Sequence, residues 1–244
     1  MQIKAVLFDM FDTLALIDND YGFYNHAIER MYKYIVKQGI NVSFEQFREA
    51  YIKARNELYA VADKTLEEPH FNQRVQNALQ LLGHNLDAKN PTITGATWEF
   101  CQEFLNHVKI DENAKNVLQN LHDKYTLGII SNFAIPEGVH AVLKTNKIEE
   151  LFDIVVVSGE VNKRKPSPEI FQNTLKQIGI PAENVVFVGD TADADIAGAH
   201  RTGIKSVYIR RRFEQELEKF IPDIIIENLA ELPSALKNIS NYKQ

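Results

Sequence analysis

The sequence predicts an α/β fold, with a doubly wound, Rossmann-like parallel sheet as its core and an all-helical cap domain inserted after the first strand. Short apolar runs rich in valine and isoleucine alternate with helical segments through the second half of the chain. That pattern is typical of a buried parallel sheet covered on both faces. One similar run stands alone near the N-terminus, and no convincing strand appears between about residues 16 and 107. We therefore expect a core of residues 1–15 and 108–244 and a cap of residues 16–107.

Size and charge narrow the possible classes of protein. The 244 residues suffice for one large domain or for a domain that carries an inserted one. With a formal net charge of -6, the chain lacks a basic field that would hold nucleic acid or an anionic membrane. The basic runs 163–165 and 210–212 are interpreted as solvated, apart from any member that a motif claims. The single cysteine, Cys101, excludes an internal disulfide, and its helical spacing between Trp98 and Leu105 predicts a core thiol.

No targeting segment is apparent in the sequence. Asp9 interrupts the apolar start of the chain, which is far too short for a signal peptide or a membrane span. We expect a cytoplasmic protein, monomeric or homodimeric, whose partner is a small-molecule substrate rather than a nucleic acid or a membrane.

Four helices are predicted in the cap. The first has an apolar residue at every third or fourth position from Tyr24 to Ile35. Ser43 and Gln46 form a capping box that begins the second, and Gly83 is placed to end the third. The predicted elements are helices over 24–35, 44–58, 71–82 and 98–108, with a polar loop over 85–95.

The core alternates helix and strand. Each strand is a short, mostly β-branched apolar run, and Gly179 is placed to end one of the helices. The predicted strands cover 6–8, 127–130, 154–157, 185–188, 206–209 and 223–226. The predicted helices cover 114–121, 139–148, 170–178 and 195–201, followed by a short terminal helix.

Residues able to do chemistry follow four of these strands. Asp9 comes after the first strand, Ser131 and Asn132 after the second, Lys165 several residues after the third, and Asp190 after the fourth. Because parallel strands present their carboxyl ends at one edge of a sheet, these groups are expected to converge there. Together they supply a carboxylate that can attack, a hydroxyl and an amide that bind oxygens, an ammonium group, and a further carboxylate for a cation.

The order and spacing of these residues resemble the haloacid dehalogenase superfamily of hydrolases, most of whose members are phosphatases. The helical insertion resembles the first type of cap found in that superfamily. The matching positions are Asp9 and Thr13 in the first motif, Ser131 in the second, Lys165 in the third, and Asp190 and Asp195 in the fourth.

The resemblance implies a magnesium-dependent hydrolase that acts on a small phosphorylated metabolite. Asp9 would attack the substrate and form a covalent aspartyl intermediate, which water then hydrolyses. Mg²⁺ would be held by the carboxylates of Asp9 and Asp190 and by the backbone carbonyl of Phe11, since hard oxygen donors suit this ion.

The remaining roles are also implied by the resemblance. Lys165 would offset the charge of nucleophile and substrate, and Ser131 would donate a hydrogen bond to a substrate oxygen. Asn132, Phe11, Ser131 and Lys165 are expected to contact the substrate, and Thr13 is counted with the catalytic residues. Asp195 would orient Lys165 or the water shell of the metal.

One position departs from the phosphatase pattern. Phe11 stands where these phosphatases usually carry a second Asp, which protonates the leaving oxygen and activates water. General acid–base assistance of this kind is worth roughly 10²–10⁴ in rate. Its loss predicts slow cleavage of alkyl phosphates and a bias toward better leaving groups. Asp12 is a conceivable substitute, although the side chain at that position normally points elsewhere.

Two alternatives stay open. The 2-haloacid dehalogenases carry an apolar aromatic residue at position 11, but they work without metal, lack the paired acids, and use a cap arginine. No arginine occurs near Ile40, where it would fall, and the nearest, Arg30 and Arg48, are interpreted as surface residues. The second alternative is a non-catalytic descendant that binds a metabolite or a protein.

Overall fold

The computed structural model describes residues 2–18, 22–211 and 217–241. Its centre is a six-stranded, all-parallel sheet in the order β5-β4-β1-β6-β7-β8, so the predicted α/β class is confirmed. β1, the first strand of the chain, lies inside the sheet between β4 and β6. The strands are β1 (Ala5–Phe8), β4 (Thr126–Ser131), β5 (Ile154–Val157), β6 (Val185–Gly189), β7 (Lys205–Ile209) and β8 (Ile224–Ile226).

Helices cover both faces of the sheet, as the uninterrupted apolar strands require. Val6 and Phe8 of β1 belong to the apolar cluster shared with α5, α6 and α10, whereas Ala5 and Leu7 belong to the one shared with α8 and α9. The alternation follows from the two-residue period of a strand. The helices of this part are α5 (Ala114–His122), α6 (Pro136–Thr145), α7 (Ser158–Val161), α8 (Pro168–Ile178), α9 (Ala197–Arg201) and α10 (Leu232–Asn241). Short helical turns lie at η1 (Glu149–Leu151), η2 (Ala182–Asn184), η3 (Ala192–Ile196), η4 (Leu217–Lys219) and η5 (Leu229–Glu231).

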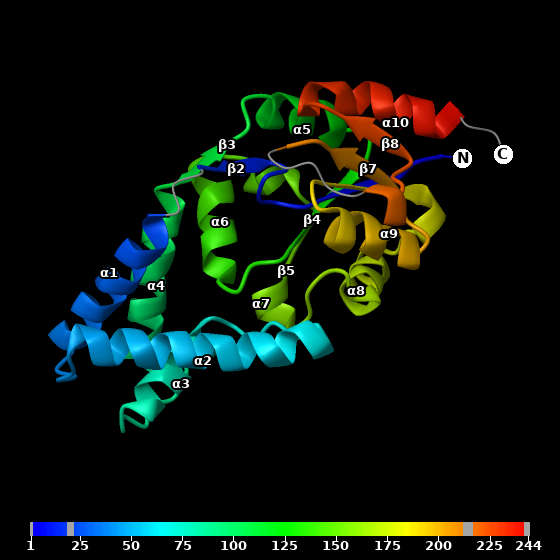
Figure 1. Cartoon of the computed structure of the whole chain (residues 1–244). Coiled ribbons are helices and arrows are strands. Elements are labelled where there is room, and N and C mark those ends of the chain that lie inside the picture. The colour runs from blue at the N-terminus through cyan, green and yellow to red at the C-terminus, as the bar shows by residue number, and fades with distance from the viewer. Residues whose placement is uncertain (1, 19–21, 212–216, 242–244) are drawn as a thin grey trace.

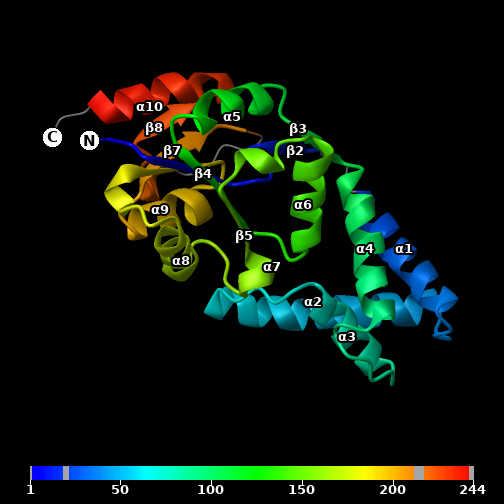
Figure 2. The ribbon, with the colours of Figure 1, turned by 180° about the vertical axis from the view of Figure 1, so that it is seen from behind.

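Four helices between β2 and β3 form a separate layer beside the sheet (Figures 1 and 2). They are α1 (Phe23–Lys37), α2 (Phe44–Thr65), α3 (Asn72–Leu81) and α4 (Pro91–Leu105). They bury their own apolar cluster, and the capping box of Ser43 and Gln46 begins α2 as predicted. Cys101 is fully buried in this cluster, which confirms the core thiol, and burial raises the pKa of that thiol to about 12.

Two predictions for this region were wrong. The predicted loop over 85–95 ends at Asn90, because the Asn90 side chain caps α4 and Pro91 occupies its first turn. A short antiparallel ribbon of β2 (Ala15–Ile17) and β3 (Val108–Ile110), which also takes Val108 out of the predicted helix, was not foreseen. Three residues are too few to show the alternation of a strand. The ribbon lies where the chain leaves the sheet for the helices and where it returns.

Other boundaries shift without changing the topology. The predicted helix over 139–148 begins earlier, at Pro136, and ends at Thr145. The predicted helix over 195–201 is a π-helical turn, Ala192–Ile196, that continues into α9. None of the described helices combines the length and the apolar character needed to cross a bilayer.

Close packing at Gly128 of β4 yields a test of the sheet. A Cβ atom at this position would lie 2.6 Å from Ile154 Cγ2 and 2.7 Å from Leu7 Cδ2. We expect Gly128→Ala to lower the free energy of unfolding by about 1–3 kcal/mol, because a packed core resists added volume. Thermal denaturation would show this as a drop of roughly 2–4 °C per kcal/mol. An unchanged melting temperature would contradict the packing described for β1, β4 and β5.

Candidate active site

The predicted residues meet where three neighbouring strands end. β4, β1 and β6 lie side by side and are followed or ended by Ser131, Asp9 and Asp190. Asp9 is only 7% exposed, and its backbone N–H donates to the Val188 carbonyl, 2.8 Å away. The parallel register therefore brings together groups that lie far apart in the sequence.

Lys165 reaches the same point from the loop between α7 and α8. Its ammonium nitrogen lies 2.6 Å from Asp9 Oδ1 and 2.7 Å from Asp195 Oδ1, and the residue is 2% exposed. Burial alone would lower the pKa of Lys165, but the charges of Asp195 and Asp9 outweigh it and raise the pKa. The side chain is therefore a cation held between two carboxylates.

Asn132 fixes the backbone of Lys165. Its Oδ1 accepts a hydrogen bond from Lys165 N at 2.7 Å, and its Nδ2 donates to Lys165 O at 3.0 Å. The sequence predicted a substrate contact at Asn132. The structure gives its amide a positioning role that the sequence did not reveal.

Asp195 is engaged on both carboxylate oxygens. One pairs with Lys165, and the other accepts a hydrogen bond from Thr191 N at 3.0 Å. Gly189 makes this arrangement possible, because a Cβ atom there would overlap the Asp195 carboxylate. This geometry agrees with the interpretation of Asp195 as the residue that orients Lys165.

Three carboxylates compete for one ammonium group. Asp9, Asp190 and Asp195 each offer an oxygen within 4.8 Å of the others. Burial raises the pKa of Asp9 to about 6, although Lys165 opposes the shift. Burial and then the charge of Asp9 raise the pKa of Asp190 to about 8. A divalent cation would relieve this excess of negative charge, and hard oxygen donors suit Mg²⁺. The residues therefore fit the metal that the resemblance implies.

Two hydroxyl groups in the site have no hydrogen-bond partner among the described residues. Ser131 and Thr13 are fully buried, and the side-chain oxygen of each is unpaired. Buried polar groups in proteins are nearly always paired. The Ser131 hydroxyl at the end of β4, next to β1, is therefore available to hydrogen-bond an oxygen of a bound molecule.

Phe11 belongs to an aromatic cluster rather than to the charged centre. Its ring centroid lies 5.2 Å from that of Phe104 and 4.8 Å from that of Phe133. The neighbouring Asp12 has a left-handed backbone with φ 57, and its Oδ1 accepts a hydrogen bond from Ile17 N at 3.1 Å. One carboxylate oxygen of Asp12 therefore stabilises the turn before β2, in agreement with the expectation that this side chain is not directed as the missing acid would be.

Sequence reasoning missed Arg211. The run 210–212 was interpreted as solvated, but the side chain of Arg211 is 13% exposed. It donates to the carbonyls of Asp12 and Thr13 at 3.0 and 2.8 Å and pairs with Asp111 at 3.0 Å. Its place just after β7, at the active edge of the sheet, was the available signal. Arg212 lies outside the described residues.

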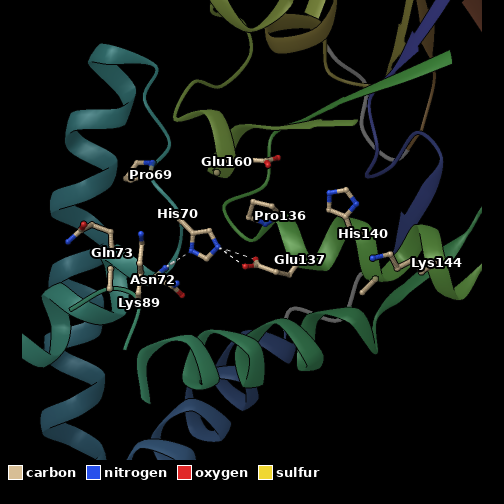
Figure 3. Close-up of a pocket in the computed structure, with 13 residues that line it drawn as sticks. Pro69, His70, Asn72, Gln73, Lys89, Pro136, Glu137, His140, Lys144 and Glu160 are labelled. Atoms are coloured by element: carbon tan, nitrogen blue, oxygen red, sulfur yellow. Dashed lines mark hydrogen bonds and ion pairs between the residues drawn. The ribbon is translucent and has the colours of Figure 1, made fainter. Parts of the chain in front are cut away.

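Among the cavities of the described residues, two large ones lie between the helical layer and the core. The larger, about 810 Å³, is lined by residues such as Pro136 and by His70, which pairs with Glu137 of α6 (Figure 3). None of the predicted site residues lines it. The smaller, about 500 Å³, is lined by Asn132 and Phe133, which follow Ser131 directly. We therefore assign the smaller cavity to the site.

Comparison with known proteins identifies relatives in sequence and in fold. The glyceraldehyde 3-phosphate phosphatase of Methanopyrus kandleri is 26% identical over 243 residues, covering 98% of this chain and 99% of that protein. The crystal structure of 2-haloacid dehalogenase from Pseudomonas syringae pv. Tomato DC3000 matches with a TM-score of 0.69 at 22% identity, covering 97% of this chain and 99% of that one. The HAD phosphatase from Thermococcus onnurineus matches with a TM-score of 0.65 at 24% identity, covering 96% and 98%.

The two structural matches establish the fold alone, because their identities are low. The family model described as haloacid dehalogenase-like hydrolase matches residues 6–209, which include every residue of the site described above except Arg211. This match, together with the shared fold, shows that the chain belongs to the haloacid dehalogenase-like hydrolases.

Proposed function

We propose that the protein is a magnesium-dependent phosphatase that hydrolyses a small phosphorylated metabolite through a covalent aspartyl intermediate at Asp9. The observation that carries this proposal is the buried Lys165 ammonium, held 2.6 Å from Asp9 and 2.7 Å from Asp195. A buried ion pair adds little net stability to a fold. The phosphatase name of the Methanopyrus relative also supports the proposal.

Asp9 is the proposed nucleophile. A carboxylate oxygen of Asp9 bonds to phosphorus as the bond from phosphorus to the leaving oxygen breaks, and that oxygen departs with the electron pair. Lys165 neutralises charge on the nucleophile and substrate, and the orphaned Ser131 hydroxyl donates to a phosphoryl oxygen. Water then attacks the aspartyl-phosphate and frees Asp9.

The metal site is proposed to use the carboxylates of Asp9 and Asp190 with the backbone carbonyl of Phe11. Bound Mg²⁺ would supply charge stabilisation for the transferring phosphoryl group. Because the Phe11 ligand is a backbone carbonyl, the loss of an acidic side chain there does not remove it. Thr13 is placed in the same loop, whose carbonyls Arg211 holds.

Residues 16–107 are proposed to act as a cap domain that opens to admit substrate and closes to exclude water. Phe23, Tyr24 and Phe104 from this region line the smaller cavity together with Asn132 and Phe133 from the core. A substrate whose phosphate meets Asp9 would thus place its leaving group between the two layers.

A second candidate function is hydrolytic dehalogenation, which Phe11 favours because a departing halide needs no proton. The acidic pair Asp190 and Asp195 argues against it, since a metal-independent reaction has no need of both. Arg48 is exposed, as expected, whereas Arg30 is half-buried and pairs with Glu99 at 2.7 Å, and neither lines the cavity assigned to the site. Halide release from 2-chloropropionate that resists EDTA would establish this alternative.

The nucleophile is tested by Asp9→Asn. We expect hydrolysis of p-nitrophenyl phosphate to fall to background, because an amide is a poor nucleophile. The melting temperature should stay equal or rise, since burial disfavours the charged form of Asp9. Asp193→Asn, which changes an exposed acid in the turn after β6, is the matched control and should retain wild-type turnover. Turnover by Asp9→Asn near the wild-type rate would refute the assignment.

The substitution Phe11→Asp tests whether the lack of an acid at position 11 limits protonation of the leaving group. Phe11→Ala is the control, because it removes the ring without adding a carboxylate. We expect Phe11→Asp to raise kcat for an alkyl phosphate by about tenfold or more relative to p-nitrophenyl phosphate, since only the poor leaving group needs a proton. Steady-state kinetics on both substrates measure this ratio. An equal ratio in the two variants would show that position 11 does not limit protonation.

Metal binding is expected to release protons. Because the pKa of Asp190 is raised to about 8 and that of Asp9 to about 6, part of the metal-free population carries protons that Mg²⁺ must displace. The apparent affinity for Mg²⁺ should therefore increase as the pH rises from 6 to 8. Calorimetry at pH 7 in two buffers of different ionisation enthalpy measures the released protons. An affinity that does not change with pH would contradict this.

A further inference from the structure

Arg74 of α3 is a buried cation with no acidic partner. The residue is 8% exposed, and none of the ion pairs among the described residues includes it. Arginine is always charged at physiological pH. Proteins rarely bury such a group unless it is paired.

Two aromatic rings pack against the guanidinium group of Arg74, but its Nε donor has no hydrogen-bond partner among the described residues. The guanidinium carbon lies 4.9 Å from the ring centroid of Tyr59 and 4.6 Å from that of Phe71. Its Nη1 donates a long hydrogen bond of 3.4 Å to the Tyr51 hydroxyl. The two rings thus orient a cation whose hydrogen-bonding capacity is unfilled.

This cation lines the smaller cavity, whose lining also includes Asn132 and Phe133, the two residues that follow Ser131. Two acids share the lining. Asp63 is exposed to solvent, and Glu68 accepts a hydrogen bond from Ser158. Neither forms an ion pair with Arg74 in the described part of the chain. The half-buried Arg164 adds a second cation to the same wall.

Another arginine of the helical layer shows the contrast. Arg30 of α1 is more exposed than Arg74, yet it lies 2.7 Å from Glu99 and 3.2 Å from Glu103 of α4. Arg30 is therefore balanced by two acids of α4, which packs against α1. Arg74 has aromatic rings and a cavity instead.

We infer that Arg74 binds an anionic group of the substrate, remote from the phosphate that is hydrolysed. This inference rests on the proposed phosphatase function and gives its substrate class: a phosphate monoester that carries a second anionic group, either a carboxylate or a second phosphate. The guanidinium would donate to that group as the phosphate meets Asp9 at the other end of the cavity. The anion would supply the charge partner and fill the open donor of Nε.

The test compares substrates that differ in the second group. The anionic members are 3-phosphoglycerate and 1,3-propanediol bisphosphate, and the neutral member is glycerol 3-phosphate. We expect kcat/KM of the wild type to be about tenfold or more higher for at least one anionic member, as a charge-assisted hydrogen bond predicts. Arg74→Gln should reduce that preference to within about twofold, whereas the control Arg30→Gln should keep it. A preference for 3-phosphoglycerate identifies the second anionic group as a carboxylate, and a preference for the bisphosphate identifies it as a phosphate.

A binding measurement covers the case in which Arg74→Gln does not fold. In the Asp9→Asn chain, the preferred anionic substrate should raise the melting temperature more than glycerol 3-phosphate does. Equal rates and equal thermal shifts for charged and neutral members, or a preference that survives in Arg74→Gln, would overturn the inference. Hydrolysis of p-nitrophenyl phosphate, which has no second anion, reports on the proposed function separately. Its complete absence would refute the phosphatase while the thermal shifts still decide the role of Arg74.

Discussion

The architecture of the site depends on one buried ion-pair arrangement, the Lys165 ammonium between the carboxylates of Asp9 and Asp195. Lys165 arrives from a loop beyond β5, Asp9 from the end of β1 and Asp195 from the turn after β6. Three buried charged side chains stay in contact only if the backbone positions that carry them are fixed. Asn132 fixes Lys165, and the absence of a Cβ atom at Gly189 leaves room for Asp195.

The loop that follows Asp9 is held by a second set of contacts, which come from Arg211. Asp12 takes a left-handed conformation, which an L-residue adopts at some cost. Arg211 donates to the carbonyls of Asp12 and Thr13 and pairs with Asp111, so the turn is held from the loop after β7, two strands away from β1. This hold keeps the carbonyl groups of the loop oriented beside Asp9, where the proposed metal needs a backbone oxygen.

The core strands and the convergence of Asp9, Ser131, Lys165 and Asp190 could be predicted because both follow from local patterns. A β-branched apolar run identifies a buried parallel strand, and the residue after it lies at the carboxyl edge. Contacts between distant segments left no such pattern. The pairing of β2 with β3 joins three-residue strands, and the clamp by Arg211 joins residues 198 positions apart. The capping of α4 by Asn90 was local, but a proline-containing polar stretch resembles a loop until the cap is seen.

The two buried cations among the described residues, Lys165 and Arg74, differ in what balances their charge, and this difference links the catalytic site to the cavity. Lys165 has two carboxylates within hydrogen-bonding distance, and its neutralisation is complete without any ligand. Arg74 has two aromatic rings and a tyrosine hydroxyl, which stabilise a cation only in part. The helical layer therefore carries positive charge at Arg74 that no carboxylate balances there. At the end of β6, negative charge is in excess, as the raised pKa of Asp190 shows. A substrate with a metal-bound phosphate at one end and a second anion at the other would balance the negative charge near Asp190 and the positive charge of Arg74. We therefore expect the cavity lined by Arg74 to select the substrate.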